Sequence, residues 1–100
     1  MISGAALSIG RIVHFVLGLR PEETVIRPAM IVNVNATGTV DLCVFTNGYA
    51  DDRYLKNDEC SSRDSRGKAR SVVHRMNVVE AGDPAARPLG CWFWPPRTGS

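Results

Sequence analysis

The stretch Thr39-Val-Asp-Leu-Cys-Val-Phe45 decides the fold expected of this chain. Its even positions hold Val40, Leu42 and Val44, and other residue types alternate with them. A period of two is typical of a β-strand that buries one face of its sheet. The Asn47-Gly48 pair that follows is a strong turn signal. We therefore predict a strand over residues 39–45 that ends in a turn.

Four other segments have a strand-like composition between turn-forming residues. Pro28 opens one of them, which suits a strand start because proline has no N–H to donate. Residues 35–38, Asn-Ala-Thr-Gly, join that segment to 39–45 as a hairpin. By contrast, Leu19–Arg27 contains Pro21 and is predicted to be a loop or a frayed ribbon. The other predicted strands are Arg11–Leu17, Ala29–Val34, Ala69–Met76 with a continuation towards Val79, and Gly90–Trp94.

These segments predict an all-β fold, a small SH3-like and partly open barrel of about five strands with two long loops. Residues 49–68 carry ten charges and one large aliphatic residue, Leu55, so we expect a charged surface loop there. The second loop spans residues 80–89 and contains Gly82, Pro84 and Pro88. Residues 1–9 are expected to form an N-terminal arm, and residues 1–100 a single domain.

The composition excludes several classes of protein. Hydrophobic residues make up 44% and charged residues 22%, as in an ordinary soluble globular domain. The net charge of +2 argues against a strongly basic nucleic-acid arm, and no apolar run reaches the ~20 residues that cross a bilayer. The three cysteines, Cys43, Cys60 and Cys91, have no CxxC spacing, so we expect reduced thiols, no metal site and no cofactor.

The sequence carries no catalytic signature. It contains neither a GxSxG motif nor a glycine-rich phosphate loop, and three of its serines, at 61, 62 and 65, cluster in the charged loop. Neighbouring carboxylates such as Asp51-Asp52 would point to opposite faces of a strand, so we interpret the acidic pairs as solvated turn charges. We therefore expect that the protein is not an enzyme.

One basic cluster could contact a phosphate group or an acidic partner. It consists of Arg63, Arg66, Lys68 and Arg70, within eight positions. Five acidic residues in the same loop nearly balance it, which favours a solvated loop. Because a nucleic-acid footprint normally raises the charge of the whole domain, this pattern disfavours nucleic acid as a partner. An SH3-like nucleic-acid adaptor, with steeply salt-dependent binding, stays a third alternative.

The stretch Trp92-Phe-Trp-Pro95 is the most informative for interactions. Alternation places Trp92 and Trp94 on one face of the last strand and Cys91 and Phe93 on the other. One face is expected to pack in the core. Because an aromatic side chain can bury ~150–250 Å², the other face calls for a partner surface. We predict a subunit interface at this strand, with Trp92, Phe93 and Trp94 as candidate contacts.

Several motifs occur together in a fixed order. They are GRIVHFVL at residues 10–17, RPA at 27–29, VDLCVF at 40–45 with Asn47-Gly48 after it, Ser71-Val72, and WFWP at 92–95. Over residues 10–96 the chain resembles a widespread family of small tailed-phage and prophage proteins, which typically read GRIVHYVL, RPAIV, LQVFxDG, a TSV strand and a terminal WHWP. The resemblance implies a phage origin and a compact β fold, and it brings no catalytic residues. Phe93 replaces the histidine of the last motif, which argues against an essential histidine there.

We therefore expect a non-enzymatic bacteriophage protein that acts by binding, foremost as a virion structural or accessory component. Examples are a capsid decoration (cement) subunit and a head–tail or tail component. The alternative is a counter-defence protein that sequesters a host nucleotide signal or blocks a host factor. A deep pocket of arginine and aromatic side chains between subunits would favour that alternative. Expected partners are other phage proteins or copies of this chain in a homo-oligomer, not a membrane, and the expected location is the virion or the host cytoplasm during infection.

Overall fold

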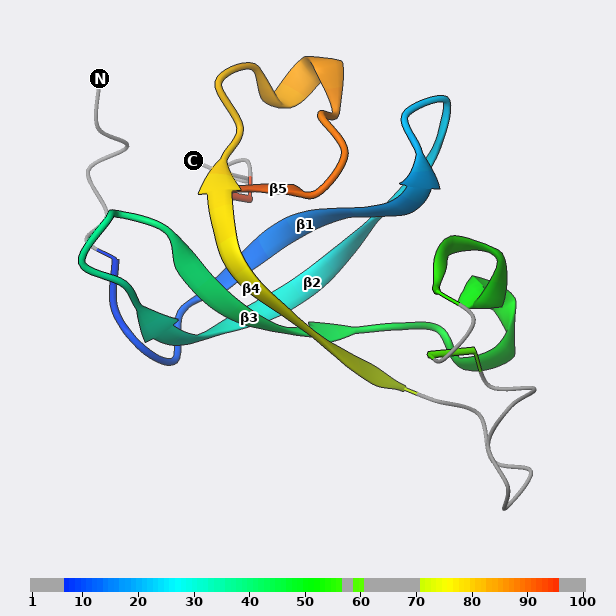
Figure 1. Cartoon of the computed structure of the whole chain (residues 1–100), viewed down its shortest axis with the longest axis horizontal. Helices are drawn as coiled ribbons and strands as arrows, with labels where there is room; N and C mark the ends of the chain where they lie inside the picture. The colour runs from blue at the N-terminus through cyan, green and yellow to red at the C-terminus, as the bar shows by residue number, and fades with distance from the viewer. Residues whose placement is uncertain (1–6, 57–58, 61–70, 96–100) are drawn as a thin grey trace, which may run out of the picture.

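The computed structural model describes residues 7–56, 59–60 and 71–95. Its strands are β1 (Ile12–Arg20), β2 (Glu23–Val34), β3 (Val40–Phe45), β4 (Val72–Glu80) and β5 (Cys91–Phe93), as Figure 1 shows. In this part of the chain, 3-10 helices form at η1 (Gly48–Tyr54) and η3 (Pro84–Ala86).

The strands follow one another in chain order around a closed barrel. β1 pairs antiparallel with β2, β2 with β3, and β3 with β4, and β5 closes the barrel by pairing antiparallel with β1 and parallel with β4. The predicted small all-β barrel is thus confirmed. It is closed rather than partly open because β5 reaches both edges, where Trp92 pairs with Phe15 and Cys91 with Val79.

The prediction of a loop over Leu19–Arg27 is wrong. β1 continues to Arg20 and β2 already begins at Glu23, which leaves a turn of only two residues. Pro21 lies in that turn, where the missing N–H interrupts no strand pairing. Gly18 allows the close approach of the two strands, because a Cβ there would stand 2.6 Å from the carbonyl oxygen of Glu23.

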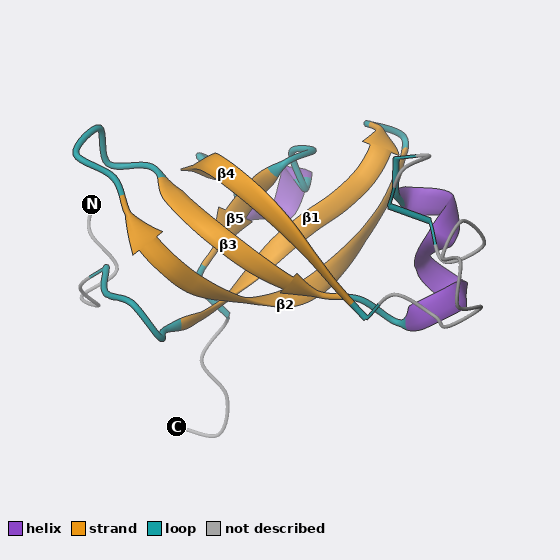
Figure 2. Ribbon diagram, turned by 60° about the horizontal axis from the view of Figure 1, so that its bottom comes forward, coloured by secondary structure: helices purple, strands orange, loops and turns teal. Residues whose placement is uncertain are grey.

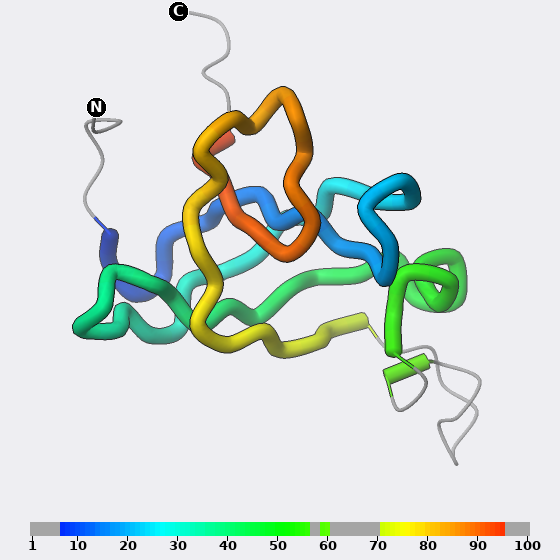
Figure 3. Tube along the Cα trace, turned by 45° about the horizontal axis from the view of Figure 1, so that its top comes forward, coloured from blue at the N-terminus to red at the C-terminus, as the bar shows by residue number. Residues whose placement is uncertain are grey.

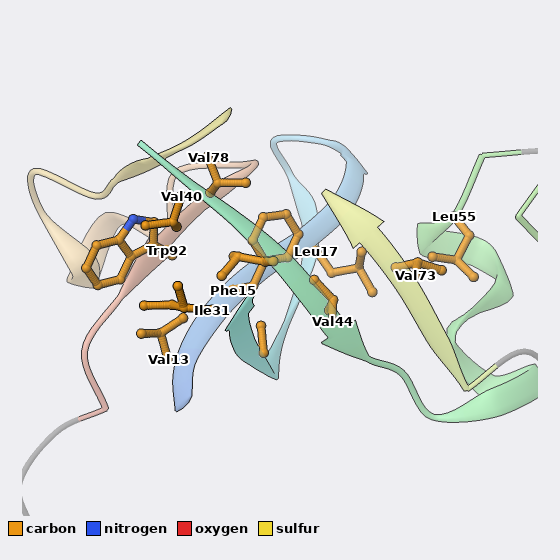
Figure 4. Packing of buried hydrophobic residues seen from close by; sticks show 12 residues of the cluster. Val13, Phe15, Leu17, Ile31, Val40, Val44, Leu55, Val73, Val78 and Trp92 are labelled. Carbon is orange, nitrogen blue, oxygen red and sulfur yellow. The ribbon is translucent and has the colours of Figure 1, made fainter. Parts of the chain in front are cut away.

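Alternation along the strands separates core from surface. Val13, Ala29, Val44 and Val73 lie in register across β1 to β4, and each is at most 3% exposed. The alternation predicted over residues 39–45 is confirmed, because its even positions are all buried. The rest of the core, drawn in Figure 4, comprises Phe15, Leu17, Ile31, Val40, Leu42, Leu55, Val78 and Trp92.

Part of the predicted surface loop 49–68 packs against the barrel instead. η1 lies at one end of the barrel in Figure 2, beside the turn between β1 and β2. Leu55, directly after η1, is 1% exposed and belongs to the core, and Tyr54 packs against the core. The prediction failed here because a few inward-facing residues, such as Leu55 and Tyr54, anchor a segment whose overall composition is charged.

The segment from Ala81 to Gly90 covers the outside of β1, as the orange stretch of Figure 3 shows. The N–H of Gly90 donates to the carbonyl oxygen of Val16 over 3.0 Å, and Val16 is fully buried although it points away from the barrel core. Within this segment, Asp83 caps η3 by accepting the N–H of Ala85 at 3.1 Å. This covering segment and the outer side of the barrel together form the wall of a pocket.

Candidate binding surfaces

One row of outward-pointing side chains runs across four strands. Ile12 of β1 pairs with Met30 of β2, Met30 with Cys43 of β3, and Cys43 with His74 of β4. Each of these residues is the sequence neighbour of a residue in the buried row Val13–Ala29–Val44–Val73, so its side chain points to the outside. The row is therefore a continuous feature of the barrel surface.

Further apolar side chains extend this row along the strands. Phe45 pairs with Val72, while Val32 and Met76 lie at strand irregularities and are 43% and 73% exposed. We call the set of eight the outer face: Ile12, Met30, Val32, Cys43, Phe45, Val72, His74 and Met76. None of the eight is Asp, Glu, Lys or Arg. Asp41, between the buried Val40 and Leu42, does point to the same side of β3. Its carboxylate accepts hydrogen bonds from Asn35 and from the N–H of Asn77. Because outward positions of an antiparallel sheet in water are usually polar, this composition is typical of a contact surface.

The aromatic residues of the last strand lie at two different depths. Trp92 is 1% exposed and meets Trp94 edge to face, with 5.3 Å between ring centroids. Phe93 points the other way and meets His14 edge to face at 5.4 Å. Trp92 fills the core where the barrel closes and has no surface for a partner, which corrects its predicted place in an interface. Phe93 and Trp94 are half-buried, and for them the interface stays a prediction.

An open pocket of about 700 Å³ lies where the covering segment meets the barrel. His14 of β1, Ile26 of β2 and Phe93 of β5 contribute to its wall. Volumes of this size accommodate small molecules. The pocket is formed within one chain, whereas the sequence led us to consider one between subunits. Its complete lining is His14, Ile26, Pro84, Ala85, Arg87, Phe93 and Trp94.

The lining carries a guanidinium and an imidazole but no carboxylate. Arg87 follows η3 in a left-handed conformation with φ of 48°, and its N–H donates to the carbonyl oxygen of Pro84. Among the described residues, its side chain takes part in none of the salt bridges. Asp83, the nearest acidic residue in sequence, directs its carboxylate to the backbone of η3. The pocket is thus both apolar and suited to negative charge.

A bidentate ion pair holds η1 against the barrel. Arg27 Nε and Nη2 donate to Asp51 at 2.6 and 2.8 Å, and the N–H of Asn47 donates to the same carboxylate at 2.8 Å. The hydrogen bond from Arg27, with that from Asn47, holds the pKa of Asp51 below its ordinary value although burial opposes ionisation. Asp51 is 1% exposed, so its interpretation as a solvated turn charge is wrong.

A second ion pair ties the end of the 49–60 region to β4. Arg75 donates to both carboxylate oxygens of Glu59, at 2.6 and 3.0 Å. Burial favours the neutral acid, but Arg75 and the N–H of Lys56 outweigh it and leave the pKa of Glu59 below its ordinary value. Glu23 similarly accepts hydrogen bonds from Arg20 and Arg53. Four arginines outside the pocket thus each have a carboxylate partner: Arg20, Arg27, Arg53 and Arg75. Arg87 has none among the described residues.

The predicted basic cluster of Arg63, Arg66, Lys68 and Arg70 lies outside the described residues. Cys43, Cys60 and Cys91 are free thiols. No group of three or more His, Cys, Asp or Glu that could hold a metal ion occurs in the described ranges. Within those same ranges, no helix has the length and apolar character to cross a membrane.

Sequence reasoning missed the pocket because its residues come from four separate segments. Pro84, Ala85 and Arg87 belong to a stretch that was predicted only as a loop. Arg87 is the one basic residue of the 80–89 loop, and this was the available signal.

No protein-family model, curated protein or solved structure matches this chain.

Proposed function

We propose that this protein is a non-enzymatic bacteriophage protein that acts by binding, as a structural or accessory component of the virion. A capsid decoration subunit and a head–tail or tail component are the forms this role would take. Its place would be the virion and, before assembly, the cytoplasm of the infected host. The phage assignment rests on the motif resemblance, and the binding role rests on the outer face.

The outer face is the observation that carries the proposal. Ile12, Met30, Cys43 and His74 form an in-register row across four strands, with exposed Val32 and Met76 beside it. Exposed apolar surface is unfavourable in water, and covering it contributes about 25 cal/mol per Å². Assembly on a particle would cover this surface permanently.

We propose a second copy of the chain as the first partner of this face. A mainly apolar surface gains from contact with its own copy, and a two-fold interface brings the same patch of both copies together. The carboxylate of Asp41 beside this face is already engaged by Asn35 and by the N–H of Asn77. His14 lies two residues after Ile12 on the outer side of β1, and it also lines the open pocket together with Phe93. The pocket is therefore next to the outer face. Contacts between copies could therefore extend to Phe93 and Trp94, as predicted for the last strand.

Mass spectrometry of gradient-purified particles of the encoding phage tests this role. We expect peptides of the protein at a stoichiometry comparable to that of the major capsid or tail proteins. A phage that carries Met76→Glu should incorporate less protein than one that carries Leu19→Glu, because Leu19 is exposed but lies outside the outer face. Expression during infection without any incorporation into particles would contradict the proposal.

A further inference from the structure

We propose that the pocket beside η3 binds a small molecule in which a flat aromatic ring carries an anionic group. A nucleoside monophosphate and an aromatic carboxylate are the two sources of this chemistry. The inference does not depend on the virion role, because the pocket is complete within one chain. None of its lining residues belongs to the outer face, although Phe93 and Trp94 are also the predicted contacts of the last strand.

Apolar and aromatic groups make up the part of the pocket that would take the ring. Ile26, Pro84 and Phe93 offer apolar surface, and Trp94 offers an indole. Trp94 is held in place from two sides, because its ring packs edge to face on Trp92 and the guanidinium carbon of Arg11 lies 5.2 Å from its centroid. A ring wall that is already ordered loses little side-chain entropy when a ligand binds.

Arg87 and His14 would take the anionic group. A guanidinium presents parallel N–H donors that match a carboxylate or phosphate, and such charge-assisted hydrogen bonds are stronger than neutral ones. No carboxylate lines the pocket to compete for Arg87. His14 meets Phe93 edge to face, which brings a nitrogen-bearing ring next to the apolar wall.

The backbone at Arg87 fixes where this side chain begins. A non-glycine residue with positive φ is costly and persists where the surroundings impose it, often at ligand sites. Here the Asp83 cap and the hydrogen bond from the N–H of Arg87 to Pro84 hold the turn. The cation is therefore presented from a defined position at the rim of the pocket.

Titration calorimetry with defined probes tests the proposal, and tryptophan fluorescence gives a local readout because the chain has only two tryptophans. The probes are AMP, its fragments adenosine and ribose 5-phosphate, and indole-3-acetate. We expect AMP or indole-3-acetate to bind, and each AMP fragment to bind about tenfold or more weakly than AMP if AMP is the ligand type. Binding of indole-3-acetate alone would identify the carboxylate source. Failure of both complete probes would overturn the proposal.

Three variants locate the binding in the pocket. Arg87→Asn removes the charge yet tolerates the left-handed backbone, and it should weaken binding about tenfold or more. Ala85→Trp fills the pocket from its exposed rim and should abolish binding. Arg20→Asn makes the same change of charge at the turn between β1 and β2, and it should leave affinity unchanged. Equal affinity in Arg87→Asn and Arg20→Asn, or full binding by Ala85→Trp, would overturn the proposal.

Discussion

Asp51→Ala should lower the free energy of unfolding by about 3 kcal/mol. The change leaves the guanidinium of Arg27 without the carboxylate that now accepts two hydrogen bonds from it. Removing one partner of a buried ion pair costs about 3–5 kcal/mol. Arg27 keeps 25% of its side chain exposed and can recover some hydration, so we expect the lower end of that range.

The double variant Arg27→Met/Asp51→Ala distinguishes the lost pair from a simple loss of packing. With both charges gone, the N–H of Asn47 is the donor that loses its acceptor in the described part of the chain, and the expected loss falls to about 1 kcal/mol. Urea denaturation followed by circular dichroism measures all variants, with Glu22→Ala as an exposed control that should stay within about 0.5 kcal/mol of the wild type. A double variant that is as unstable as Asp51→Ala would refute this reasoning.

Four further predictions concern stability and use the same denaturation assay. Because the folded-state pKa of Asp51 lies below the ordinary value of 3.8, its contribution should be complete above about pH 5 and decline as the pH falls through 3.8 and then the folded pKa; a stability independent of acid pH would contradict this. Gly18→Ala should cost about 1–3 kcal/mol, because the new Cβ meets a backbone oxygen; a neutral effect would show that the strands can separate freely. Asn77→Val should cost about 1–2 kcal/mol relative to Asn77→Gly, since φ is 54° there; equal stabilities would argue against that backbone conformation. Trp92→Ala should cost about 3–5 kcal/mol, and a small effect would mean that the barrel closes without this side chain.

The strand pattern was readable wherever a single strand both alternates and ends in a turn. Residues 39–45 meet both conditions, and their even positions are buried as predicted. Pro21 misled the reading of Leu19–Arg27, because the effect of a proline depends on whether it occupies the turn or the paired strand. The local sequence does not tell these two positions apart.

The candidate sites could not be predicted from the sequence in full, because they depend on contacts between residues far apart in the chain. Arg27 and Asp51 are 24 positions apart, so no local pattern reveals that they neutralise each other. Alternation correctly placed Trp92 and Trp94 on one side of the last strand, as their ring contact shows. Which of them is buried follows from the closure of the barrel. The position of Arg87 in the pocket likewise depends on tertiary structure, because it follows from the way the 81–90 segment folds over β1. The composition of that segment does not indicate this.

The molar mass of the protein in solution tests the proposed docking through the outer face most directly. Light scattering behind a sizing column, over a range of micromolar concentrations, should give a multiple of the single-chain mass. Val32→Glu and Met76→Glu should each shift the population to single chains, because each places a charge on an exposed residue of that face. Leu19→Glu should behave as the wild type. A wild-type protein that stays a single chain at every concentration, or face variants that assemble as it does, would contradict the proposed interface.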